Sequence, residues 1–109
     1  MTSNKVFKAL ADPTRRRVLE LLREGSLTAG ELSGQFPVSK PTMSAHFSVL
    51  QEAGLIEAER DGRVIYYRLK MSVLEDALLG FADAFGIDKA SRGARGAKRN
   101  RLALRRREV

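Results

Sequence analysis

A set of small and polar side chains lies on one face of a predicted helix near the middle of the chain. On a helical wheel this face carries Pro41, Ser44, Ala45 and Ser48, with Lys40 at its N-terminal edge, and no carboxylate joins it until the end of the helix. Hydroxyl and ammonium groups donate hydrogen bonds, and an acid-free helix N-terminus attracts anions. We therefore expect this face to approach phosphates and base edges of nucleic acid.

A tight turn is predicted at Asp61-Gly62, between two segments in which apolar residues alternate. Leu55–Arg60 and Arg63–Lys70 are rich in Ile, Val and Tyr, so they predict two strands of a hairpin. Arg63 directly follows the turn, where it either contacts the backbone or minor groove of a nucleic acid or is simply solvated. Ile65, Tyr67 and Leu69 fall on one side of the second strand and should face the helices.

Start and stop signals place three helices before the hairpin and a fourth one leading into it. The first covers 4–10, and the second begins at Pro13 after the capping residue Asp12 and ends at Gly25. Thr28 and Glu31 form a capping box that opens a short third helix. The fourth helix runs from its cap Ser39 to about Ala53, and its inward stripe consists of Met43, Phe47 and Leu50.

A last helix opens near Ser72 and carries an apolar seam made of Leu74, Leu78, Phe81 and Phe85. This seam is larger than a terminal helix over a small core requires, so we expect it to pair with its twin across a dimer axis. The fold class predicted is mainly α with a small β-hairpin: a homodimeric winged helix-turn-helix of about five helices and a two-stranded wing.

The sequence also resembles a known family. FKALADPTRRRVLELL (7–22), LTAGELS (27–33), SKPTMSAHFSVLQEAGLI (39–56) and DGRVIYYRL (61–69) resemble the ArsR-type bacterial repressors, within them the small autorepressors without metal-ligand motifs. The resemblance implies a dimer formed by the first helix (Val6, Phe7, Leu10) and the last. It also implies recognition of operator DNA by Ser39, Lys40, Thr42, Ser44 and Ala45, with the wing at Asp61, Gly62 and Arg63.

Several residues have two interpretations. His46 is the only histidine, and it is either a hydrogen-bonded structural residue at the helix flank or a phosphate contact, with a ligand role less favoured. Arg15, Arg16 and Arg17 point in different directions round a helix, so a solvated face is favoured over phosphate contacts. Tyr66 and Tyr67 indicate strand packing rather than a base-stacking platform.

The net charge of +7 is confined to the C-terminal segment of this 109-residue chain. Residues 1–85 carry eleven basic and eleven acidic side chains, whereas 86–109 carry nine basic and two acidic ones. We interpret 1–85 as one DNA-binding and dimerisation domain and 86–109 as a flexible basic tail. The tail is a solubilising terminus, a non-specific DNA contact or, less favoured, a membrane-surface contact.

Composition excludes several function classes. Without cysteine the chain has no disulfide or thiolate metal site, and carboxylates replace the family's metal ligands in the last helix, so no metal and no cofactor are expected. Neither a signal peptide nor an apolar run long enough to span a membrane is visible, which predicts a cytoplasmic, nucleoid-associated protein.

The leading hypothesis is a dimeric, sequence-specific DNA-binding repressor or autorepressor on a near-palindromic operator, with an effector of unknown nature. The alternative is an antirepressor-like interaction module that binds a protein through the last helix. An enzyme is not expected, because no nucleophile-base pair, phosphate-binding loop or metal motif is present.

Overall fold

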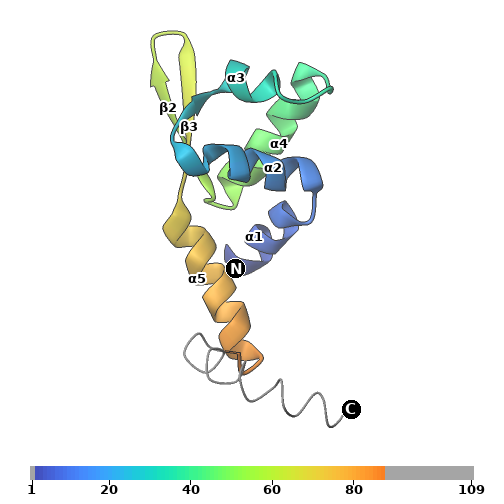
Figure 1. Ribbon diagram of the computed structural model, residues 1–109, viewed down its shortest axis with the longest axis vertical. Helices are drawn as coiled ribbons and strands as arrows, with labels where there is room; N and C mark the ends of the chain where they lie inside the picture. The colour runs from blue at the N-terminus through green and yellow to red at the C-terminus, as the bar shows by residue number, and fades with distance from the viewer. Residues whose placement is uncertain (1, 88–109) are drawn as a thin grey trace. The chain divides into compact units, whose positions relative to one another are not determined.

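The computed structural model describes residues 2–87, which form five α-helices, one 3-10 turn and a three-stranded sheet (Figure 1). The helices are α1 (Thr2–Leu10), α2 (Pro13–Leu21), α3 (Ala29–Ser33), α4 (Lys40–Glu52) and α5 (Met71–Ala84). The strands are β1 (Leu27–Thr28), β2 (Ile56–Asp61) and β3 (Val64–Leu69). This order confirms the predicted winged helix-turn-helix.

Side-chain caps set the helix starts as the sequence predicts. The carboxylate of Asp12 accepts hydrogen bonds from the backbone amides of Thr14 and Arg15 at 2.8 and 3.1 Å, with Pro13 in the first turn of α2. Thr28 and Glu31 form the reciprocal capping box of α3, at 2.9 and 2.8 Å. These caps satisfy amides that a helix start otherwise leaves without partners.

The sheet differs from the prediction in two respects. Its order is β1-β3-β2, because Leu27 and Thr28 pair antiparallel with Tyr67 and Tyr66 and so add a short third strand to the two-stranded wing. The hairpin loop also begins one residue later than expected, since Asp61 pairs with Val64 at the end of β2. The loop residues are Gly62 and Arg63, and only Gly62 has a positive φ, +66°, as in a type II′ turn.

Residues 1–77 form one compact unit whose core is built by one stripe from each element. The inward stripe of α4 is fully or almost fully buried, as predicted for Met43, Phe47 and Leu50. The ring of Phe47 lies against that of Tyr67 on β3, with centroids 4.7 Å apart. This contact confirms the expected inward side of β3 and anchors α4 against the sheet.

Residues 78–87 belong to a second unit. Those up to Ala84 complete α5, and the ring of Phe85, just beyond the end of this helix, lies 5.0 Å from that of Phe81. The predicted basic tail lies outside the described residues except for its first two positions, so the proposed boundary at residue 85 stays a prediction.

Candidate nucleic-acid interface

The exposed face of α4 is the central feature of the candidate interface. All seven residues predicted on or beside this helix are exposed: Ser39, Lys40, Pro41, Thr42, Ser44, Ala45 and Ser48. They are exposed because the opposite stripe of α4 packs into the core, which turns this face of the helix outward. The structure therefore presents these side chains together on one surface.

The first turn of α4 combines a side-chain cap with an absence of acidic residues. The hydroxyl of Ser39 accepts a hydrogen bond from the Thr42 amide at 3.3 Å and donates one to the Thr42 hydroxyl at 2.9 Å. Lys40 follows directly, with its ammonium group in solvent. A 13-residue helix that begins with hydroxyl groups and a cation is suited to bind phosphate oxygens.

A hollow of about 480 Å³ lies beside this face, between α3, α4 and β3. Lys40 and Ser44 line one side, the glycines of α3 another, and Phe47 and Tyr67 the floor. A Cβ atom added at Gly30 would meet only the Thr28 hydroxyl, 3.9 Å away, so the α3 side of the hollow is open. The surface is therefore concave next to the candidate contact residues.

The charged side chains of the wing, the hairpin formed by β2 and β3, lie on two different faces of the sheet. Because Arg60 pairs with Ile65 and Ala58 with Tyr67, Arg60 lies on the sheet face that packs against α4. Glu57, Glu59 and Asp61 alternate onto the other face. There Glu57 forms ion pairs with Arg68 and, at 3.6 Å, with Lys70.

Arg60 is thus a candidate contact that sequence analysis missed, although strand parity with Ile56 and Ala58 would have revealed it. The predicted wing residues Asp61, Gly62 and Arg63 are all exposed at the tip. Asp61 lies on the acidic face, whereas Arg63 and Gly62 form the loop itself. The basic side chains of the wing therefore include Arg60 as well as Arg63.

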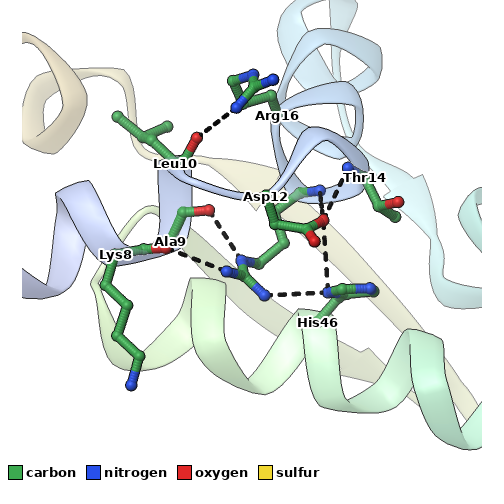
Figure 2. A network of polar contacts seen from close by, with 8 residues as sticks. Lys8, Ala9, Leu10, Asp12, Thr14, Arg16 and His46 are labelled. Carbon is green, nitrogen blue, oxygen red and sulfur yellow. Dashed lines mark hydrogen bonds and ion pairs between the residues drawn. The ribbon is translucent and has the colours of Figure 1, made fainter.

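A polar network joins the C-terminal end of α1, the start of α2 and the middle of α4 (Figure 2). The guanidinium of Arg15 donates to the backbone carbonyls of Ala9 and Lys8 and lies 3.2 Å from Nδ1 of His46. Arg16 donates to the carbonyl of Leu10 at 2.8 Å. The expectation of a merely solvated arginine face is therefore wrong for the half-buried Arg15, whereas Arg16 is exposed as expected and also bonds to α1. The interpretation of His46 as a hydrogen-bonded residue is confirmed.

Asp12 belongs to the same network, 4.0 Å from Nδ1 of His46. Burial by itself would raise the pKa of the Asp12 carboxyl. The amides of Arg15 and Thr14, together with the nearby charges of His46 and Arg15, outweigh burial and hold this pKa below its ordinary value. The carboxylate is thereby kept ionised as the cap of α2.

The residues predicted at a dimer interface fall into three groups. Val6 is fully buried in the core, so it cannot contact a partner, and its inclusion was wrong. Phe7, Leu10 and Leu74 are half-buried. Leu78 and Phe81 on α5 are 45% and 52% exposed, and Phe85, which follows the end of the helix at Ala84, is 68% exposed. Such exposure is unusual for large apolar side chains that lie near one another.

Within residues 2–87 no group of three histidine, cysteine or carboxylate side chains is placed to hold a metal ion. None of the helices in this described range is long and apolar enough to cross a membrane.

Comparison with known proteins places this geometry in a family. Residues 10–59 match the model of a helix-turn-helix domain. The chain is 47% identical over 75 residues to the transcriptional repressor SdpR of Bacillus subtilis, which covers 69% of this chain and 83% of the relative. The chain belongs to the ArsR family of transcriptional regulators. It is thus a winged helix-turn-helix, DNA-binding repressor, and its relatives give no support to the antirepressor-like alternative.

Further similarities agree with membership of the ArsR family. The chain is 43% identical over 88 residues to the arsenic resistance transcriptional regulator ArsR1 of Pseudomonas putida, covering 77% of this chain and 69% of that one. A solved structure of an ArsR family transcriptional regulator superimposes with a TM-score of 0.73 and 32% identity, over 77% of this chain and 92% of its own. These relatives are regulators rather than enzymes.

Proposed function

We propose that two copies of this chain bind a near-palindromic operator, with α4 of each copy in the major groove of one half-site. Half-sites about one helical turn apart, roughly 34–36 Å, suit a two-fold dimer that presents one recognition helix per copy. The single observation that carries this proposal is the exposed, acid-free face of α4, whose first turn bears hydroxyl groups and Lys40.

Each group of residues has a stated role in this proposal. Lys40, Ser39 and Thr42 contact phosphates at the helix start, while Ser44, Ala45 and Ser48, with Pro41 at the edge, face the bases. The wing approaches the adjacent backbone through Gly62, Arg63 and Arg60, with Asp61 at the tip turned to the acidic face. Sequence preference then comes from α4, and the arginines of the wing add affinity for any duplex.

The dimer interface is proposed to consist of α5 and the end of α1. The exposed seam of Leu78, Phe81 and Phe85 supports it, because burial of water-exposed phenylalanine and leucine side chains against a second copy lowers the free energy of the dimer. Within the first unit, Leu10 and Leu74 line an apolar groove of about 210 Å³, which we propose as a separate part of the interface. Phe7 lies on the same helix as Leu10.

We further propose that the protein acts by binding alone, without a catalytic step or a resident cofactor, and that it acts on chromosomal DNA in the cytoplasm. The proposal includes an effector that relieves repression.

The test is a selection of binding sites from a pool of randomised DNA duplexes, followed by affinity measurements with the recovered duplex and with a random one. Ser44→Glu places a carboxylate against the bases, so we expect its affinity for the recovered duplex to fall by about 100-fold or more. Ser26→Glu is the matched control, because Ser26 is an exposed serine beside Glu57 and Glu59 on the acidic face of the wing. Its affinity should stay close to that of the wild type.

Equal losses in both variants would show that general repulsion, and not the α4 face, sets the affinity. A wild-type protein that recovers no preferred sequence at moderate salt would contradict sequence-specific recognition. The mass of the free protein in solution, measured by light scattering, tests the dimer separately.

A further inference from the structure

The guanidinium of Arg15 is shared between two helices. Its Nε donates to the carbonyl of Ala9 at 2.8 Å and its Nη2 to that of Lys8 at 3.1 Å, both in the last turn of α1. Its Nη1 lies 3.2 Å from Nδ1 of His46, in the middle of α4. Arg15 itself is half-buried, and Figure 2 shows these acceptors gathered around the start of α2.

The α1 side of this arrangement is a helix C-terminus whose carbonyls lack partners within the helix. Arg15 and Arg16 together donate to the carbonyls of Lys8, Ala9 and Leu10. Two neighbouring arginines of α2 therefore fix the end of α1, the helix that we place at the dimer interface. A helix C-terminus also favours nearby positive charge.

The α4 side is a single polar contact on a helix otherwise held by apolar packing. Among the residues described, His46 is the α4 side chain that hydrogen-bonds to another element, since Ser39 and Thr42 bond only to each other. Apolar contacts have little directionality, whereas a hydrogen bond fixes both distance and angle. His46 directly follows the exposed Ser44 and Ala45, so rotation about α4 would move all three together.

The surroundings of His46 combine one hydrogen-bond donor with two charged groups. A guanidinium group can only donate, so Arg15 is the donor in its contact with Nδ1. Two charged groups face it: Arg15, and Asp12 from the cap of α2 at 4.0 Å. From α1 only the carbonyls approach, and the Lys8 ammonium points away in Figure 2, while Lys40 and Glu52 lie six residues to either side along α4.

We propose that Arg15 and His46 are positioning residues for DNA recognition, which hold α4 at a fixed rotation against the end of α1. Neither residue touches DNA in this arrangement. They act through the α4 face, and the inference therefore rests on the proposed function of that face. It adds a link between the helix proposed for dimerisation and the helix proposed for recognition, which lets the two functions influence each other.

The test measures sequence preference, defined as the affinity for the selected duplex divided by the affinity for a random duplex of equal length. Arg15→Lys keeps the positive charge but loses the fork that reaches three acceptors, so we expect preference to fall by about tenfold. Arg17→Lys is the matched control, because Arg17 is exposed and pairs only with Glu20 on its own helix. It should leave preference unchanged.

His46 supplies the second arm and a readout that loss of stability would not reproduce. His46→Ala should lower sequence preference about as much as Arg15→Lys does. The double variant should show little further loss, because each substitution removes the same contact between Arg15 and His46. His46→Asn places an amide oxygen near the position of Nδ1, so it should restore preference.

Thermal unfolding of every variant shows whether the fold is intact. If Arg15→Lys does not fold, the His46 variants still test the positioning role, because they leave the contacts of Arg15 with α1 in place. Unchanged preference in His46→Ala, or equal losses for both duplexes, would overturn the inference while the proposed function stands. A wild-type protein without any preference would instead remove the proposed function, and this inference with it.

Discussion

Two helices of nearly equal length, α4 with 13 residues and α5 with 14, use their apolar sides in opposite ways. In α4 the apolar stripe of Met43, Phe47 and Leu50 is at most 4% exposed, and the outward face is polar. In α5 only Ala77 is buried among the residues described, and large apolar side chains remain in contact with water. The chain itself buries the apolar stripe of α4, whereas it leaves most of the large apolar side chains of α5 exposed.

The difference indicates what each helix requires from a partner. Because α4 has already buried its apolar stripe, the surface left to a partner consists of hydroxyl groups, Ala45 and Lys40, which suits a hydrated, anionic molecule such as DNA. Because α5 has not, it suits a second apolar surface. The two proposed binding functions thus fall on different helices: DNA binding on the polar exposed face of α4, and dimerisation on the apolar exposed side of α5.

Truncation of the α4 stripe should have the largest effect. Leu50 is fully buried, so Leu50→Ala should lower the free energy of unfolding by about 2–5 kcal/mol through lost burial and a residual cavity. Chemical denaturation at several protein concentrations measures this loss, which should persist at every concentration. Ser48→Ala, on the exposed face of the same helix, should change stability by less than about 0.5 kcal/mol.

A charge on the α5 seam should have the next largest effect, and on association rather than folding. Leu78→Asp places a carboxylate in the proposed interface, so the dimer dissociation constant should rise by about 100-fold or more. Leu79→Asp is its matched control, since Leu79 is equally apolar and exposed but points away from the seam. Sedimentation equilibrium distinguishes the two, and similar dissociation in both variants would place the interface elsewhere.

Local rules were sufficient to predict most of the fold. Asp12, Thr28 with Glu31, and Ser39 all cap helices as expected, because a cap depends on residues within three positions of it. The buried stripe of α4 followed from helical spacing, and the exposed face of α4 followed as its complement. This complement is why the proposed contact residues of α4 could be named before the structure was known.

The errors arose where distant segments meet. The strand β1 has two residues, too few for any periodic pattern, and it exists because β3 offers a free edge to Leu27 and Thr28. The hairpin loop was displaced by one residue because Asp61 completes a pair with Val64. Arg15 and His46 are 31 positions apart, so no spacing rule could join them. Tertiary packing decided each of these features.

The smallest expected effect is that of a substitution in the polar network of Asp12, Arg15 and His46. It tests whether this network stabilises the position of α4, as the apolar stripe does. Asp12→Asn keeps a capping oxygen on α2 but removes the charge near His46 and Arg15, so it should cost only about 0.5 kcal/mol of stability at pH 7. In the wild type the folded-state pKa of Asp12 lies below its ordinary value of 3.8, so its charge contributes stability above that pH and loses it as the pH falls through the folded value. The wild type and Asp12→Asn should therefore differ in denaturation experiments above the ordinary pKa of Asp12 and converge as the pH falls through its lowered folded-state pKa. A difference that stayed constant across this range would mean that the amide, and not the lost charge, is responsible. It would then follow that α4 relies on Arg15 alone for its polar contact with the rest of the unit.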